Sequence, residues 1–491
     1  MAKRIRPAIV LLLIGILIGL ILGYALSEHV RLANPATPLH TPRGGLSTSL
    51  TPIRALDTQI VGPLSGSALP SAQGATRYMS TRGRDSNPCT QSRPCATLSH
   101  ISALMVPGDE VIIDTGIYAA PQTFTASGSV SAPVTITAQD TGAVTITYPL
   151  HAPDAMQQQR LLWLPGNKNV TVNGLSFVGM LHRSDKNPAD CPGGPCAGSG
   201  SGHYGDGMVE DASAGAFGTG ITYSNLTILD SQDGCLKFND HDVATHNYIS
   251  NCGATTYAHD IYANSGHNTI TYNYFGTSPG WNVECMDANC RVAENYFYDV
   301  PGDEQQGALL EPVSPSTATA NYIDTGGAIG VKVATGVTVM GNLLVNNGYG
   351  VNCGRALGGC AVLNNTFYDS GIALEDDAGY GGEFTQPITF ENNIVYNDTP
   401  TALTNVPFAA GVTPTIDHND YVNVTLTRNT AGHDYDGGHS ITGNPLFIAA
   451  RLLQGDFHIR PGSPARGNGL DLGAAPCGNP NDMGALPSGC G

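Results

Sequence analysis

The sequence has little charge, and only a small part of that charge is positive. Charged residues make up 13% of the 491 residues, against roughly 25% in an average soluble domain. Long amphipathic helices need charged outer faces, so this scarcity argues against a mostly helical fold or a coiled coil. Lysine and arginine number 22 against 40 acidic residues, which gives a formal net charge of −18. Nucleic acid is therefore not expected as a partner, because its backbone would add like charges.

Glycine and apolar residues are abundant instead. The chain contains 61 glycines and 32 prolines, and 41% of its residues are hydrophobic, which is enough to bury a core and argues against general disorder. Because 491 residues exceed one ordinary compact core, we expect either several domains or a solenoid.

The first 26 residues predict a membrane segment. Three basic residues precede an uncharged apolar run from Pro7 to Leu26, which is long enough to span a bilayer with its amino end inside. A cleaved signal peptide is the alternative, because Gly23, Tyr24 and Ala25 have the small-x-small pattern of a cleavage site. Both interpretations export the rest of the chain. We expect a protein at the cell surface, anchored through residues 1–26, or a secreted one.

The segment 27–75 separates this region from the expected folded domain, 76–491. It is rich in proline, serine, threonine and glycine and has no hydrophobic period. Such a composition predicts a flexible linker that lifts the folded domain off the membrane.

The 12 cysteines indicate disulfide bonds and an oxidising compartment. Zinc binding is the alternative, but no CxxC pair occurs and the cysteines are scattered along the chain. Five sequence-local pairs leave Cys235 and Cys252 over; the pairs are Cys89/Cys95, Cys191/Cys196, Cys285/Cys290, Cys353/Cys360 and Cys477/Cys490.

A repeat of short segments begins near Arg77. Each segment has an alternating strand that leads to an asparagine, with an apolar residue two positions later, as in TITYNYF (269–275). The asparagines are 21 to 28 residues apart, and Leu175 and Leu226 occupy the same place in earlier segments. Repeats of this length, made of strands and turns, are typical of one coil of a parallel β-solenoid. We expect a hydrogen-bonded ladder of side chains at one corner of the coils, formed by Asn247, Asn273, Asn295, Asn321, Asn342, Asn365, Asn393 and Asn419.

Both ends of the repeat region resemble a known family. The segment 77–118, with its PGD-x-V pattern, and the segments DFHIRPGSPARGNG (456–469) and DMGA (482–485) resemble the first and last coils of right-handed parallel β-helix proteins of the pectate-lyase superfamily. The resemblance implies an all-β, right-handed parallel β-helix of about a dozen coils, with a short helix capping the first. It says little about activity, because the superfamily contains lyases, hydrolases, epimerases and non-catalytic binders.

One strand of each coil gathers polar residues. Five segments, from GDGMVEDA (205–212) to GALLEP (307–312), can be stacked so that alternate side chains face inward or outward, one per coil and about 4.8 Å apart. The expected inward column is Val209, Leu236, Ile261, Val283 and Leu309. The expected outward column is Glu210, Lys237, Tyr262, Glu284 and Leu310, beside Met208, Cys235, Asp260, Asn282 and Ala308.

This patch has the groups needed to handle an anionic sugar. Lyases of the resembled superfamily hold calcium on carboxylates to neutralise a uronate, while a lysine or arginine removes the proton next to the sugar's carboxylate. The resemblance implies that Lys237 is the base, helped by a cation that offsets its acidic neighbours. Tyr262 is expected either to protonate the leaving oxygen or to stack on a sugar face. Glu284 and His259 complete the expected catalytic set. Asp260, Asn282 and Asn239 are expected to bind substrate, and Glu210, Asp206 and Asp233 to bind calcium.

Two alternatives stay open. A glycoside hydrolase would use a carboxylate pair such as Asp260 and Glu284, although the signature of polygalacturonate hydrolases is only partly matched, at Asp233 and Gly234. A non-catalytic binding or adhesion solenoid would carry the same residues as a solvated ladder of charges, with Lys237 paired to its neighbours. We therefore expect a polysaccharide as ligand, most of all an acidic one cleaved by β-elimination, with the particular sugar left open.

Overall fold

The fold is a stack of short parallel strands. A computed structural model describes residues 74–148, 160–179, 207–210, 212–213, 216–231, 234–253, 258–278, 280–298, 306–310, 315–325, 329–355, 358–373, 384–397, 408–424, 437–451, 455–472, 479–486 and 488, all within the unit Arg54–Gly491. Within this part of the chain no helix is long and apolar enough to cross a membrane. The predicted membrane segment 1–26 and almost all of the predicted linker lie outside the described residues.

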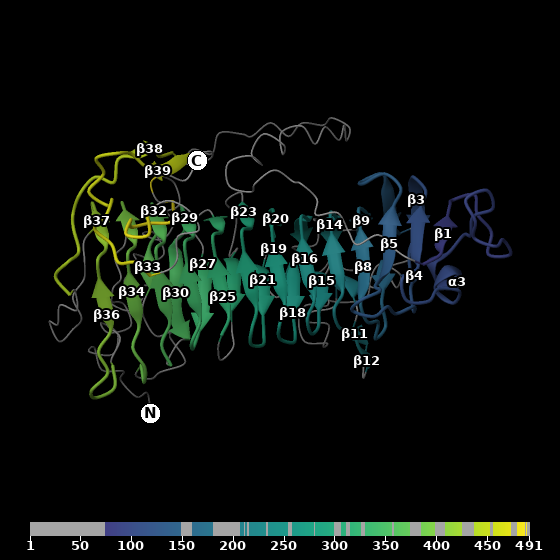
Figure 1. Ribbon diagram of the computed structural model, residues 1–491, viewed down its shortest axis with the longest axis horizontal. Coiled ribbons are helices and arrows are strands. Elements are labelled where there is room, and N and C mark those ends of the chain that lie inside the picture. Colours follow the sequence, from purple (N-terminus) through teal and green to yellow (C-terminus); the bar gives the residue numbers. More distant parts are fainter. Residues whose placement is uncertain are drawn as a thin grey trace, which may run out of the picture. The chain divides into compact units, whose positions relative to one another are not determined.

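Three parallel sheets, here called I, II and III, are visited in turn by the chain, and this order makes the coils of a parallel β-helix. Figure 1 shows the coils stacked in chain order, from β1 beside α3 to β36 and β37. The thirteen strands of sheet I are β1 (Thr76–Met79), β2 (Glu110–Ile113), β5 (Val134–Ala138), β8 (Val170–Asn173), β13 (Thr222–Ser224), β16 (Val243–Thr245), β19 (Thr269–Thr271), β22 (Arg291–Ala293), β25 (Thr317–Thr319), β28 (Thr338–Met340), β31 (Ala361–Leu363), β34 (Thr389–Glu391) and β36 (Thr415–Asp417).

Sheets II and III complete each coil, and the described strands agree with the expected dozen coils. Sheet II contains β3 (Gly116–Ala119), β6 (Val144–Thr147), β9 (Ser176–Val178), β14 (Thr227–Ser231), β17 (Tyr248–Cys252), β20 (Tyr274–Phe275), β23 (Tyr296–Tyr298), β26 (Tyr322–Asp324), β29 (Leu343–Val345), β32 (Thr366–Tyr368), β35 (Ile394–Tyr396) and β37 (Asp420–Val422). Sheet III contains β4 (Gln122–Thr123), β7 (Leu162–Trp163), β10 (Gly207–Glu210), β15 (Gly234–Phe238), β18 (Ile261–Ala263), β21 (Trp281–Cys285), β24 (Gln306–Leu310), β27 (Ile329–Ala334), β30 (Tyr349–Arg355) and β33 (Ile372–Ala373).

The asparagine ladder is confirmed at the corner between sheets I and II. Each asparagine from Asn247 to Asn393 donates through Nδ2 to the Oδ1 of the next, at 2.9 to 3.1 Å. The same Oδ1 also accepts the backbone N–H of the preceding ladder residue, as Asn295 Oδ1 does from Asn273 at 2.9 Å. Leu226 occupies the predicted equivalent place, because its N–H donates to Asn247 Oδ1 at 2.8 Å. The ladder thus satisfies backbone groups that a buried turn would leave unpaired.

Short elements pack against the stack near its two ends. The helix α3 (Leu98–Ser102) packs beside the first strands, as the family resemblance implies, and Thr97 caps it by accepting the N–H of His100 at 3.2 Å. At the other end an antiparallel hairpin, β38 (Phe447–Ala449) with β39 (Asp456–Ile459), lies beside the last coils in Figure 1. Phe457 of this hairpin contacts Tyr368 of sheet II edge-on. A second small hairpin pairs β11 (Ala212–Ser213) with β12 (Ala216–Phe217).

Four disulfide bonds are present among the described residues. Three are predicted local pairs, Cys89–Cys95, Cys285–Cys290 and Cys353–Cys360, and the fourth joins the two remaining cysteines, Cys235 and Cys252. The predicted pairs Cys191/Cys196 and Cys477/Cys490 lie outside the described residues. The zinc interpretation is therefore excluded for these eight sulfurs, because a disulfide sulfur is not a thiolate ligand.

Candidate functional site

The outer face of sheet III aligns the predicted polar column over four coils. Lys237 pairs in register with Glu210 on one side and with Tyr262 on the other, and Tyr262 pairs with Glu284. The intervening residues Leu236, Ile261 and Val283 are fully buried. The prediction that Lys237, Tyr262 and Glu284 follow one another up the stack is thus confirmed.

The fifth coil departs from the prediction by one residue. Glu284 pairs with Leu309, and Ala308 pairs with Val283, so the inward residue is Ala308 and not Leu309. Leu310, which we expected to face outward, is fully buried. The segment Ala308–Leu310 is wholly apolar, so the sequence does not indicate which of its side chains face inward. The register with β21 decides this.

His259 and Glu284 form a close polar contact between two coils at this face. His259 lies just before β18, and its Nε2 is 2.5 Å from Oε2 of Glu284 on the next coil. Their side chains are 8% and 13% exposed, so the pair is largely shielded from solvent. A carboxylate only accepts, so Nε2 carries the proton of this contact, and His259 Nδ1 is buried without a hydrogen bond.

Tyr262 lies against this pair. Its ring stacks on the His259 imidazole with 5.5 Å between ring centroids and 13° between the planes. Burial, and then the negative charge of Glu284, raise the pKa of Tyr262 above its ordinary value. The phenol is therefore protonated at neutral pH and suited to donate a proton rather than to accept one.

Asp260 and Asn282, two of the expected substrate-binding residues, are buried and make hydrogen bonds inside the fold. Asp260 is fully buried, with its Oδ1 accepting from Ser278 and its Oδ2 accepting from Asn282 at 2.7 Å. Asn282 is 5% exposed and also donates to the carbonyl of Gly276 at 3.0 Å. The turn 276–278 covers both side chains, so the prediction that they face the surface is wrong. They brace the strand that carries Glu284.

The prediction that Asn239 binds substrate on this face is also wrong. It lies one residue beyond β15, at the turn into sheet I, and is 1% exposed. Its N–H donates to Asp242 at 2.7 Å, so Asn239 belongs to a buried turn and not to the surface that carries Tyr262.

The expected calcium ligands cannot be followed in the structure. Asp206 and Asp233 lie outside the described residues, and of Glu210 only the backbone is described. Within the described part of this face, the Asp260 oxygens are already hydrogen-bonded and Glu284 contacts His259, so neither fits a multidentate calcium site as it stands. Calcium remains a prediction.

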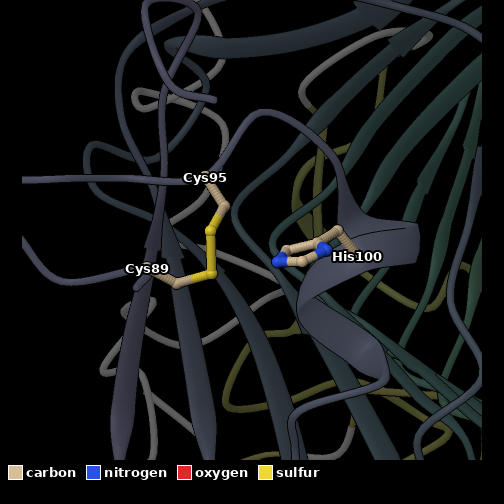
Figure 2. Close-up of side chains that lie close together, drawn as sticks. All are labelled: Cys89, Cys95 and His100. Atoms are coloured by element: carbon tan, nitrogen blue, oxygen red, sulfur yellow. A yellow bond between two sulfur atoms is a disulfide. The ribbon is translucent and has the colours of Figure 1, made fainter. Parts of the chain in front are cut away.

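A possible metal group elsewhere is excluded by its chemistry. Cys89, Cys95 and His100 bring ligand atoms within 4.8 Å of one another. Figure 2 shows the two sulfurs joined in a disulfide, with the imidazole of His100 extending from α3 toward them. A disulfide sulfur is not the thiolate that binds metals, so this group is structural.

The outward column extends further than we predicted. Glu210 pairs with Trp163 before it, while Leu309 pairs with Lys332 and Lys332 with Asn352 beyond it. Arg160 lies over the Trp163 ring at 5.8 Å. The repeated V-K and V-N pairs of β27 and β30 are the sequence signal that would have placed Lys332 and Asn352 in this column.

Comparisons with known proteins report only on the fold. No protein-family model matches the chain, and no curated protein matches it. Among solved structures, XylC in complex with xylose has a TM-score of 0.56 at 11% identity, covering 78% of this chain and 88% of XylC. GH136 lacto-N-biosidase from Eubacterium ramulus has a TM-score of 0.48 at 14% identity, covering 75% and 68%. Pectate lyase Pel9A has a TM-score of 0.45 at 12% identity, covering 84% and 96%.

The three parallel sheets, together with the similarity to XylC, show that the chain has a parallel β-helix fold. Sequence identities of 11% to 14% indicate a shared fold but not a shared activity, because proteins with unrelated activities have this solenoid.

Proposed function

We propose that the protein is a polysaccharide lyase that cleaves an acidic polysaccharide by β-elimination on the outer face of sheet III. The observation that carries the proposal is the group formed on neighbouring coils by His259, Tyr262 and Glu284, with Lys237 in register beside Tyr262. XylC, a solved structure of similar fold, contains xylose, which makes a carbohydrate the first class of ligand to test.

β-Elimination needs a base and an acid a few ångströms apart. The base takes the proton next to the sugar's carboxylate, a carbon–carbon double bond forms, and the bond to the leaving oxygen breaks as that oxygen receives a proton. Lys237 and Tyr262 face outward on adjacent strands, about 4.8 Å apart along the stack, which suits two groups acting on neighbouring sugar atoms. In this proposal Lys237 is the base and Tyr262 is the acid.

The pair formed by Glu284 and His259 holds Tyr262 ready for proton donation. The imidazole fixes the ring by stacking, and the carboxylate keeps the pKa of the phenol raised, after the larger effect of burial. His259 is a positioning residue in this account, because its free ring nitrogen is buried and does not face the surface.

An acidic substrate is supported by the charges of the column. The chain has five lysines, and two of them, Lys237 and Lys332, lie in this one column. Lys332 is only 9% exposed, so its charge lies just behind this face, where it offsets part of the repulsion between a polyanion and a chain of net charge −18. Trp163 adds an aromatic face on which a sugar ring could stack.

The hydrolase alternative has less support. It needs two carboxylates that reach the substrate, one as acid and one as base or nucleophile. Glu284 is partly exposed, but Asp260 is fully buried and has hydrogen bonds to Ser278 and Asn282. The two cannot work as a pair on a substrate outside the solenoid unless the covering turn moves.

We also propose that the protein is exported. Four disulfides among the described residues support an oxidising compartment, and the apolar run from Pro7 to Leu26 supports an export signal or membrane anchor. Labelling intact cells with a membrane-impermeant reagent tests this, because a cytoplasmic protein would stay unlabelled.

The activity itself is tested by a substrate screen on the full chain. Pectate, alginate and glycosaminoglycans are incubated with the protein, with and without a chelator, while ultraviolet absorbance of the unsaturated product is followed. Absorbance that grows with time supports the lyase, and its loss with chelator supports the calcium prediction. New reducing ends without absorbance would replace the lyase by a hydrolase, and binding without either product would leave a non-catalytic solenoid.

A further inference from the structure

A second group of metal-binding side chains lies far along the chain from this site, at the last strand of sheet I. Asp417 ends β36, and its Oδ1 accepts the backbone N–H groups of His418 and His439, both at 2.9 Å. These two bonds fix the carboxylate. Its other oxygen, Oδ2, is directed to two imidazole rings, 2.7 Å from His439 Nδ1 and 3.4 Å from His418 Nδ1.

The two imidazoles are held parallel to each other. Their ring centroids are 4.8 Å apart with 15° between the planes. His418 has the left-handed backbone conformation, with φ at 53°, that recurs just before each ladder asparagine, so its direction is set by the corner of the coil. Its Nδ1 is buried and makes no hydrogen bond, although it lies close to the carboxylate. A buried ring nitrogen without a hydrogen bond is costly unless a ligand satisfies it.

We propose that Asp417, His418 and His439 bind one divalent transition-metal ion of the zinc class through Oδ2 and the two Nδ1 atoms. Two imidazoles and a carboxylate are a common donor set for such ions. Bonds of about 2.0 Å in a tetrahedral site separate neighbouring ligand atoms by about 3.3 Å. The 3.4 Å between His418 Nδ1 and Oδ2 already fits, and the 2.7 Å of His439 needs only a small rotation of an exposed side chain.

A further carboxylate lies beside the group. Glu391 on β34 pairs in register with Asp417, one strand away in sheet I. Glu391 is not one of the three residues whose ligand atoms lie within 4.8 Å of one another, but at one strand spacing it is placed to accept a hydrogen bond from a metal-bound water. Charge also favours a cation here, since two carboxylates meet two imidazoles that are neutral when they act as ligands.

The consequence for the protein is a link between its last coil and the segment that follows. His439 belongs to the segment 437–441, which is joined to this coil by hydrogen bonds such as Gly437 N–H to Ile416 O at 2.8 Å. A metal bridging His439 to Asp417 and His418 would fasten this segment over the end of the hydrophobic core. Binding would then stabilise the folded protein.

The chain offers a matched control cluster. Asp240, His241 and His267 also bring a carboxylate and two stacked rings together, 4.5 Å apart. Here the three side chains are 46% to 59% exposed, and each ring contacts a different carboxylate oxygen. Among the described residues no backbone N–H donates to this carboxylate, and His267 Nε2 already lies 3.3 Å from Asn289 Nδ2. This open cluster should bind more weakly.

The experiment is a Zn²⁺ titration of the full chain after chelator treatment, read by a competing zinc indicator and by the melting temperature. Wild type should bind one equivalent tightly and melt at a higher temperature with Zn²⁺. His439→Gln, at a position 67% exposed, should keep the metal-free melting temperature. It should also weaken this binding by more than about tenfold and remove the rise in melting temperature. His267→Gln should change neither.

Several outcomes would overturn the site. Wild type without saturable tight binding, or His439→Gln that binds Zn²⁺ as tightly as wild type, would exclude it. Loss of tight binding in His267→Gln instead would transfer the site to the Asp240 cluster.

Discussion

Nε2 of His259 and Oε2 of Glu284 meet at 2.5 Å across two adjacent coils of the solenoid. The contact joins a turn before β18 to the middle of β21, and Tyr262 stacks on its imidazole. Three residues from two coils thus hold one another in place on this face. Such mutual positioning is what a proton-transfer site requires.

The first prediction concerns the phenol of Tyr262. Tyr262→Phe keeps the ring that stacks on His259 and removes only the proposed proton donor. Turnover on the substrate identified by screening should fall by about 10²- to 10⁴-fold, since general acid catalysis is worth that much. The melting temperature should stay close to that of wild type. Turnover within a few-fold of wild type would exclude Tyr262 as the acid.

The second prediction is the pH dependence of activity. Only protonated Tyr262 can donate, so activity should fall as pH rises through the pKa of this phenol, which burial and the charge of Glu284 raise. Glu284→Gln removes the negative charge, so the alkaline fall in kcat should move to lower pH. The measurement is a pair of pH–rate profiles. A fall that stays in place or moves to higher pH would separate Glu284 from the proton donor.

The third prediction tests the ladder. Asn295 is fully buried, accepts from Asn273 through Oδ1 and donates through Nδ2 to Ile270 O at 2.8 Å. Asn295→Ala leaves these partner groups without a hydrogen bond. The free energy of unfolding should therefore fall by about 2–5 kcal/mol, since each unpaired buried group costs about 1–3 kcal/mol.

The control for the ladder is the same substitution on an exposed asparagine. Asn264→Ala, just beyond β18, should cost less than about 0.5 kcal/mol in the same denaturant titration. If the two substitutions lowered the free energy of unfolding equally, the hydrogen-bonded ladder would contribute no more stability than an exposed asparagine in a turn.

Sequence patterns predicted the parts of the fold that repeat. Asn247 and its seven successors were found because one residue type returns at one corner, and Lys237, Tyr262 and Glu284 were aligned because polar and apolar residues alternate around them. At Leu309 and Leu310 no polar residue marks the outer side, and the prediction failed there.

The parts that could not be predicted depend on contacts between coils. The alternation of β18 leaves Asp260, one residue before it, as an expected surface acid, but the residue is fully buried and accepts hydrogen bonds from Ser278 and Asn282 of the next coil. The contact of His259 with Glu284 and that of Asp417 with His439 also join separate coils, whose turns set the directions of the side chains. The alternation of polar and apolar residues along one strand does not predict how the turns of a neighbouring coil direct their side chains.

The most direct test of the account is Lys237→Met, measured for turnover and melting temperature on the substrate that gives an unsaturated product. The account predicts a loss of turnover of about 10²- to 10⁴-fold, because the base is removed. The melting temperature should change little, since Lys237 is only half-buried and any ion pair at such a position contributes no more than about 1 kcal/mol. Turnover equal to that of wild type, with the fold intact, would contradict the proposal that Lys237 takes the proton.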